Sequence, residues 1–420
     1  MIGISLVEEM TEFKKLVEDL GKGMSGLFSY GVSDSQKAFF ISALAGRAGN
    51  QVLVVTADSL EAKRLSEDMA FFIGPEKVAV FPASTVLPYE TAARSLDSVA
   101  QRLAVMEDLV LGKSRVVVAP IQALFSKMVP PEMVLQFILK FEVGQTISLD
   151  ETLAKLSTMG YERVDMIEGK GQFALRGGIL DIYPLTRELP LRLELFDDEV
   201  DSIREFSPED QRSVNKLQQV NISPAREVIF DETMAKSAAS AIAQELKQRE
   251  NSLKALGQTQ IWDRLSEKIR QHIANFETGL FFESSELYIS HLYPKLCTIM
   301  DYFERRYATV MVEPDRIRES RRNAAYEAEE TYKGLLEKGE LLASQAGIYH
   351  NPFDITEKLK QGKVIYLSML PKIHPEFEPR GLYSFQFRSM TPLYGKLDLL
   401  CEEISRLKRK RYRVMVLSGT

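Results

Sequence analysis

The sequence predicts a multidomain α/β protein, and three observations lead to that fold class. From Gly26 to about residue 128, short continuous apolar runs alternate with helical segments, as in doubly wound sheets. Pro130-Pro131 ends this pattern, and short alternating runs with turns follow. Helical periodicity then returns, before a last apolar strand and helix. We expect an α/β domain at 1–130, an inserted small β-rich (α+β) domain at 131–223, a largely helical second part at 224–346 and a small C-terminal α/β domain, cut short, at 347–420.

Each predicted element rests on a local pattern. Apolar runs bounded by turns predict strands, and periodicity near 3.6 residues predicts helices. The predicted helices are 8–22, Leu60–Phe72, Asp97–Leu111, Leu149–Thr158, a helical stretch over Asp231–Phe276, Ile317–Leu342 and Lys396–Arg409. The predicted strands outside the insert are Val52–Val55, Val78–Phe81, Arg115–Ala119, Val364–Leu367 and Val414–Leu417.

Composition excludes several classes of protein. The 420 residues are 45% hydrophobic and 27% charged with a net charge of −6, which allows real cores and does not suit a chain that coats nucleic acid. Cys297 and Cys401 are too few for a disulfide framework or a cysteine-based zinc site. The acidic N-terminus is unlike a signal peptide, and no apolar stretch approaches membrane-spanning length. We expect a cytoplasmic protein with no membrane contact.

The C-terminal residues suggest a fragment. Val414–Ser418 has the apolar character of a buried strand, which a following helix normally covers. Only Gly419-Thr420 follow. We therefore expect the chain to be part of a longer protein, with a boundary that is either natural or engineered.

The segment Gly31 to Ala38 holds the position of a phosphate-binding loop but lacks part of its chemistry. Gly31 and Lys37 have the right spacing before a helix. Gln36 replaces the last glycine, and Ala38 replaces the hydroxyl that holds magnesium. Asp34 adds a charge of the wrong sign, and no strand between residues 26 and 128 ends in an acidic pair. We expect no nucleotide cofactor, no metal ion and no catalysis here, and a helix start capped by Ser33 or Asp34.

A second candidate site lies on the strands of the insert. In Leu191–Phe196 the three leucines share one face, which places Arg192, Glu194 and Phe196 on the other. Upstream, Arg176 points outward and is followed by Gly177-Gly178, which allow a bulge or a close backbone approach. Arginines beside an exposed aromatic ring are typical of a binding hot spot.

The same residues also fit a purely structural interpretation. Arg176 and Arg192 would then pair with Glu194 or Asp181 on a solvated face, and a neighbouring domain would cover Phe196. The residue pattern leaves both interpretations open.

Longer motifs resemble those of a known family. Gly171–Pro184, Leu191–Phe206 and Gln211–Ser213, with the upstream Phe81-Pro-Ala83 and Leu87-Pro-Tyr89, are similar to the bacterial transcription-repair coupling factors (Mfd). The excision-repair protein UvrB shares these motifs in outline but keeps an intact phosphate loop. The losses at Gln36 and Ala38 therefore fit the N-terminal, UvrB-like region of the coupling factors.

The resemblance implies a function. It implies a UvrB-like helicase-type α/β domain whose β-rich insert binds UvrA, with Arg176, Arg192 and Phe196 at the contact positions. It implies that the full-length protein is an ATP-dependent DNA translocase that displaces stalled RNA polymerase. It also implies that the motor and polymerase-binding parts lie beyond this chain, and that a C-terminal domain masks the UvrA-binding face. The alternative is a UvrB-like, nucleotide-dependent helicase remnant with weak DNA binding.

Two further patterns carry less functional weight. The basic run Arg406–Arg413 either contacts nucleic acid or complements the dipole at a helix C-terminus, and the second interpretation is favoured because one helix end is a narrow patch. The histidines have no metal-ligand spacing, at positions His272, His291, His350 and His374.

Overall fold

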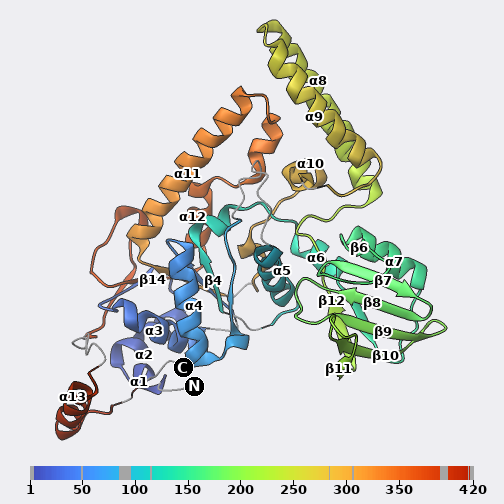
Figure 1. Cartoon of the computed structure of the whole chain (residues 1–420). Coiled ribbons are helices and arrows are strands. Elements are labelled where there is room, and N and C mark those ends of the chain that lie inside the picture. Colours follow the sequence, from blue (N-terminus) through green and yellow to red (C-terminus); the bar gives the residue numbers. More distant parts are fainter. Residues whose placement is uncertain are drawn as a thin grey trace.

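A computed structural model describes residues 4–48, 51–84, 96–113, 116–282, 284–304, 307–387, 396–414 and 416. It confirms the predicted fold class, since a parallel sheet with flanking helices is joined to a separate β-rich sheet (Figure 1). The Leu87-Pro-Tyr89 motif lies outside the described residues. No helix in the described ranges is both long enough and apolar enough to cross a membrane.

The larger sheet has seven parallel strands in the order β15-β1-β14-β13-β2-β4-β3. Its inner strands are continuous apolar runs buried on both faces, as parallel sheets require. The strands are β1 (Leu27–Tyr30), β2 (Val52–Thr56), β3 (Val78–Val80), β4 (Val116–Pro120), β13 (Ala308–Val312), β14 (Lys363–Ser368) and β15 (Gly381–Ser384).

Helices cover both faces of this sheet. One apolar cluster joins α2, α3 and α4 to alternate strand residues such as Val54 and Val310. A second cluster joins α5, α11 and α12 to the strand residues that point to the other face of the sheet, such as Val55 and Met311. The helices of this part are α1 (Ser5–Glu8), α2 (Thr11–Gly21), α3 (Asp34–Ala48), α4 (Ser59–Ile73), α5 (Leu96–Val110), α6 (Pro131–Phe137), α11 (Pro314–Glu337) and α12 (Pro352–Lys360).

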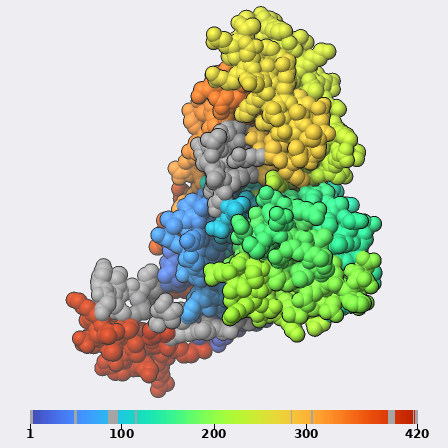
Figure 2. All heavy atoms as spheres, turned by 45° about the vertical axis from the view of Figure 1, so that its right-hand side comes forward, coloured from blue at the N-terminus to red at the C-terminus, as the bar shows by residue number. Residues whose placement is uncertain are grey.

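The predicted insert forms a six-stranded sheet in the order β11-β10-β9-β8-β7-β6, which Figure 2 shows as a green lobe. The helix α7 (Leu149–Thr158) matches its predicted bounds and begins where the Ser148 side chain accepts a hydrogen bond from the Glu151 amide. The strands are β6 (Glu162–Arg163), β7 (Gln172–Arg176), β8 (Ile179–Tyr183), β9 (Leu191–Phe196), β10 (Glu199–Phe206) and β11 (Ser213–Leu217). A separate pair, β5 (Leu139–Glu142) and β12 (Gln219–Ile222), joins the two ends of the insert.

The structure corrects the expectation of a separate C-terminal α/β domain at 347–420. β14 lies between β1 and β13 in the first sheet, and β15 forms an edge of that sheet. A local apolar run predicts a strand, but sheet membership depends on long crossovers that a local pattern does not contain. The predicted strand Val414–Leu417 falls largely outside the described residues, and the described Val414 and Val416 are not in a strand. α13 (Leu397–Arg409) has no buried residue among those described.

The helical stretch after the insert is an antiparallel pair, α8 (Glu232–Ala255) and α9 (Thr259–Glu277), which projects away from both sheets (Figure 1). Trp262 of α9 is buried. Short helical segments lie between the other elements, namely α10 (Ile289–Leu292) and the 3-10 helices Pro75–Lys77, Ile121–Phe125, Ser285–Tyr288, Ile299–Tyr302, Ala343–Ile348 and Pro375–Phe377.

His272 on α9 predicts that this helical part loses stability in mild acid. Burial, and to a lesser extent the charge of Lys268, lowers the pKa of His272 to about 4, while its Nδ1 lies 2.8 Å from the Tyr288 hydroxyl. Between its ordinary pKa of 6.5 and about 4, the unfolded chain takes up a proton that the folded chain does not, so stability falls as pH falls through this window. Chemical denaturation at pH values in and above the window is expected to show a smaller acid-induced loss for His272→Gln than for the wild type, and an equal loss would contradict this assignment.

Candidate functional site

The polar face of the six-stranded sheet carries the predicted arginines. Ala174, Asp181, Arg192 and Arg204 lie opposite one another across β7 to β10. Leu191 and Leu193 are fully buried on the other face, so the predicted alternation of β9 is confirmed. The register therefore places Asp181 next to Arg192 on the polar face.

Arg192 is held tightly inside this face. Its Nε lies 2.7 Å from Oδ1 of Asp181, and its Nη2 lies 2.9 Å from Oδ2 of Asp181 and 2.9 Å from Oε1 of Gln211. The guanidinium stacks on the Phe206 ring at 4.2 Å. The hydrogen bonds that Arg192 donates to Asp181 raise the pKa of Arg192 further above its ordinary value. With its side chain 15% exposed and that of Asp181 1% exposed, the pair is built into the domain.

Arg176 shares the same carboxylate but extends into solvent. Its Nη2 donates to Oδ2 of Asp181 at 3.0 Å, and its side chain is 47% exposed. Arg176 lies two residues beyond Ala174 on the same face of β7. There it forms a row across the sheet with Ile179, Glu194 and Ser202. A Cβ on Gly178 would lie 2.8 Å from the Leu195 carbonyl oxygen, so the predicted close backbone approach is confirmed at that glycine.

Phe196 ends β9 with its side chain in solvent. It is 76% exposed, and the turn at Asp197, whose φ of 53° lies in the left-handed region, leads into β10. On β9, Phe196 lies on the same face as Arg192 and Glu194, two residues beyond Glu194. It is therefore next to the row of Arg176 and further from the row of Arg192. The described parts of the chain leave this ring uncovered, so a domain that buries Phe196 is not among them.

The two sequence interpretations of this face are each correct in part. Both arginines do pair with Asp181, as the structural interpretation expects. Glu194 instead accepts from Arg204, at 3.0 Å. What reaches solvent is the Phe196 ring and the outer half of Arg176, so the exposed candidate surface is smaller than the predicted trio.

The Gly31 to Ala38 segment lies at the carboxyl end of the parallel sheet, where ligands bind in open α/β folds. Three of its backbone amides donate within the chain: the Gly31 amide to the Met369 carbonyl, and the Gln36 and Lys37 amides to the Ser33 carbonyl. The hydroxyl of Ser33 contacts the side chains of Ser35 and Gln36. The predicted helix start is present, with Asp34 as the first residue of α3.

Lys37 would reach the phosphates in an intact loop, but here its ammonium pairs with two carboxylates. Its Nζ lies 2.6 Å from Oδ1 of Asp34 and 2.8 Å from Oε1 of Glu313, and its side chain is 4% exposed. Burial opposes the charge, but the hydrogen bonds to both carboxylates outweigh it and raise the pKa of Lys37 above its ordinary value. A phosphate would have to displace these partners.

Sequence reasoning missed Glu313 and the strand β13 that directly precedes it. The apolar run of β13 is followed at once by this acid, and the sheet order brings it to the same edge as the loop. That run followed by an acid was the available signal. In phosphate-loop enzymes an acid after a strand holds magnesium, whereas here the carboxylate binds the loop lysine.

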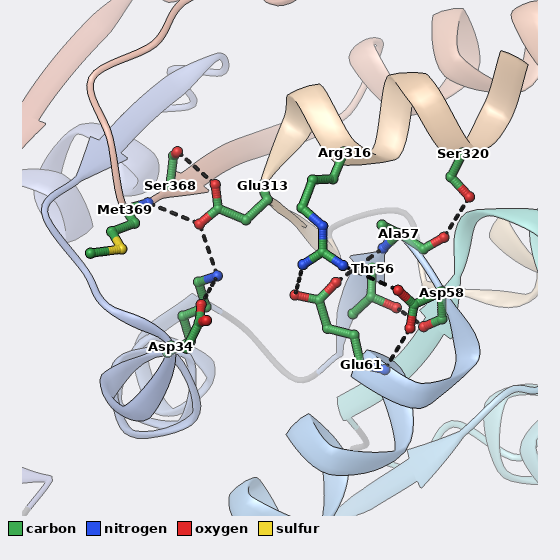
Figure 3. A network of polar contacts seen from close by, with 11 residues as sticks. Asp34, Thr56, Ala57, Asp58, Glu61, Glu313, Arg316, Ser320, Ser368 and Met369 are labelled. Atoms are coloured by element: carbon green, nitrogen blue, oxygen red, sulfur yellow. Dashed lines mark hydrogen bonds and ion pairs between the residues drawn. The ribbon is translucent and has the colours of Figure 1, made fainter. Parts of the chain in front are cut away.

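A second polar network lies beside the first (Figure 3). Arg316 of α11 contacts Asp58 at 3.2 Å and Glu61 at 3.3 Å at the start of α4. The Ser320 hydroxyl donates to the Ala57 carbonyl at 2.6 Å. These contacts tie α11 to the end of β2, so this edge of the sheet is cross-linked by charged and polar pairs.

The basic run ends α13 as the helix-dipole interpretation expects, with Arg406, Lys408 and Arg409 in the last turn. Arg406 pairs with Glu403 within the helix, and Arg413 pairs with Glu9. The run is therefore partly neutralised by local acids.

The fold and these sites define a multidomain α/β scaffold that carries an inserted β-rich domain. Residues 139–228 match the family described as the UvrB interaction domain. Over 99% of its length the chain is similar to transcription-repair-coupling factors: it is 30% identical over 415 residues to that of Bacillus subtilis (strain 168) and 28% identical over 427 residues to that of Staphylococcus aureus (strain MRSA252). The chain covers 35% of each relative, about a third of its length, and matches their N-terminal region. The resemblance stated from the motifs is thereby confirmed.

Proposed function

We propose that this chain recruits UvrA, as the adaptor region of a transcription-repair coupling factor. The observation that carries the proposal is the Phe196 ring, which is 76% exposed at the end of a rigid strand. A large apolar side chain held in solvent by fixed backbone contributes contact area at little entropic cost on binding. The match of residues 139–228 to the UvrB interaction domain supports the assignment to this lobe.

The two arginines have different roles in this proposal. Arg176 has a free outer half that can meet an acidic group of UvrA, because its bond to Asp181 uses only one of its terminal nitrogens. Arg192 holds Asp181 and the β8–β9 pairing in place. The docking surface is therefore Phe196 with Arg176, and Arg192 positions it.

The remaining activities implied by the resemblance are assigned outside this chain. In the full-length protein we expect ATP-dependent DNA translocation and displacement of stalled RNA polymerase to belong to other segments. We also expect a C-terminal domain to cover the Phe196 face until UvrA replaces it.

Purified UvrA and the whole chain test the proposal directly. Immobilised chain is expected to bind UvrA in interferometry at physiological salt. Added free chain should compete for that binding, whereas competing chain with Phe196→Ala should not. Absence of binding, or equal competition by both proteins, would reject the proposed function.

A further inference from the structure

A cluster of polar residues surrounds the Lys37 ammonium at the carboxyl end of the parallel sheet. A buried ammonium needs an anion close by, because an unpaired buried charge is strongly unfavourable. In a phosphate loop the ligand supplies that anion. Here the partly buried carboxylate of Glu313, whose side chain is 19% exposed, supplies it at 2.8 Å.

Glu313 is bound on three sides. Besides Lys37, its Oε2 accepts from the Ser368 hydroxyl at 2.8 Å, and its Oε1 accepts from the Met369 amide at 2.9 Å. Figure 3 shows the carboxylate between the start of α3 and the segment that follows β14. A carboxylate with an ammonium, a hydroxyl and a backbone amide around it has the kind of donor set that phosphate-binding loops give to a phosphate.

The backbone at Glu313 is held in a conformation that non-glycine residues seldom adopt. Its φ is 51° and its ψ 71°, in the left-handed region, and it directly precedes α11. Such a conformation is unfavourable for a non-glycine residue and persists only where surrounding contacts hold it. The Glu313 amide donates to the Leu367 carbonyl at 2.8 Å, so main chain and side chain are both fixed on β14.

The position of Glu313 in the sheet makes it a cross-link. β14 separates β1 from β13, so the Lys37–Glu313 pair spans β14 and joins the helix after β1 to the helix after β13. The contacts to Ser368 and Met369 add the end of β14 itself. One side chain therefore bridges three segments, namely α3, the start of α11 and the end of β14.

We propose that the Glu313 carboxylate takes the place of a phosphate group. It supplies the anion opposite Lys37 and holds α3, the start of α11 and the end of β14 together without nucleotide. The exposed Asp34 is a minor partner of Lys37, since its side chain is 86% exposed and water screens its charge. The Lys37–Glu313 pair, called the clamp below, is separate from the UvrA-docking face, which lies on the other sheet.

Melting temperatures of the whole chain test this clamp. Glu313→Gln, which keeps size and loses charge, is expected to lower the melting temperature by about 5 °C or more, because it leaves Lys37 buried beside the exposed Asp34 alone. Asp34→Asn is the matched control and should change it by less than about 2 °C. Adding Lys37→Met to Glu313→Gln should recover most of the loss, since the uncompensated charge is removed.

A small-anion experiment separates the stand-in role from ordinary packing. Millimolar pyrophosphate or acetate should raise the melting temperature of Glu313→Ala, leave that of the wild type unchanged, and have no effect on Glu313→Ala with Lys37→Met.

The proposal is overturned if Glu313→Gln is no more damaging than Asp34→Asn. It is equally overturned if pyrophosphate stabilises the wild type, or if the anions act on Glu313→Ala whether or not Lys37 is present. UvrA binding by folded Glu313→Gln should equal that of the wild type, so failure of the clamp and failure of the docking proposal give different results.

Discussion

Phe196→Ala is expected to weaken UvrA binding by roughly 30-fold or more while leaving the fold intact. A central aromatic hot spot contributes about 2 kcal/mol or more to binding, which corresponds to that factor. The ring is 76% exposed in the chain, so its removal costs little packing in the free protein. Titration calorimetry or interferometry with purified UvrA gives the affinity, and thermal denaturation confirms that stability is unchanged.

Leu256→Ala is the matched control for this change. Leu256 is a large apolar side chain that is 69% exposed at the tip of the α8–α9 pair, away from the β-rich lobe. Its removal should leave UvrA affinity as in the wild type. If Phe196→Ala binds UvrA as tightly as Leu256→Ala does, the docking surface is elsewhere.

Within single elements, local patterns were enough to predict the structure. The period of two in Leu191–Phe196 correctly placed Leu191 and Leu193 inside and Phe196 outside, because alternation is a property of any extended strand. The bounds of α7 were also correct, since a serine cap and helical periodicity both lie within one segment. The predicted helix at 8–22 is present as α2 (Thr11–Gly21), which begins later than predicted because Met10 adopts an extended conformation between α1 and α2.

Features that depend on register or crossovers could not be predicted in the same way. The sequence left Glu194 and Asp181 open as partners of the arginines, and only the β8–β9 register selects Asp181. The clamp was missed altogether, because Lys37 and Glu313 are far apart along the chain and meet only through the order of strands in the sheet. The charges of the site were visible in the sequence, but the pairs they form were not.

Arg192→Ala is expected to destabilise the β-rich domain by about 3 kcal/mol, whereas Arg176→Ala should cost less than about 1 kcal/mol. Removing Arg192 takes the two shortest hydrogen bonds from the buried Asp181 and uncovers the Phe206 ring. Arg176 alone would then face that carboxylate with one nitrogen. Arg192→Lys should lose most of this stability as well, because a lysine cannot reproduce the two parallel bonds of the guanidinium.

Hydrogen exchange in the whole chain measures this effect locally, which matters because unfolding of a multidomain protein is not two-state. Peptides covering β8 and β9 should exchange about 100-fold faster in Arg192→Ala and nearly normally in Arg176→Ala, while peptides of the parallel sheet stay unchanged. Equal protection in the two variants would show that Arg192 does not hold the domain together. With the expected result, weak UvrA binding by Arg192→Ala would report a disordered docking face, and only Phe196 and Arg176 variants could identify direct contacts.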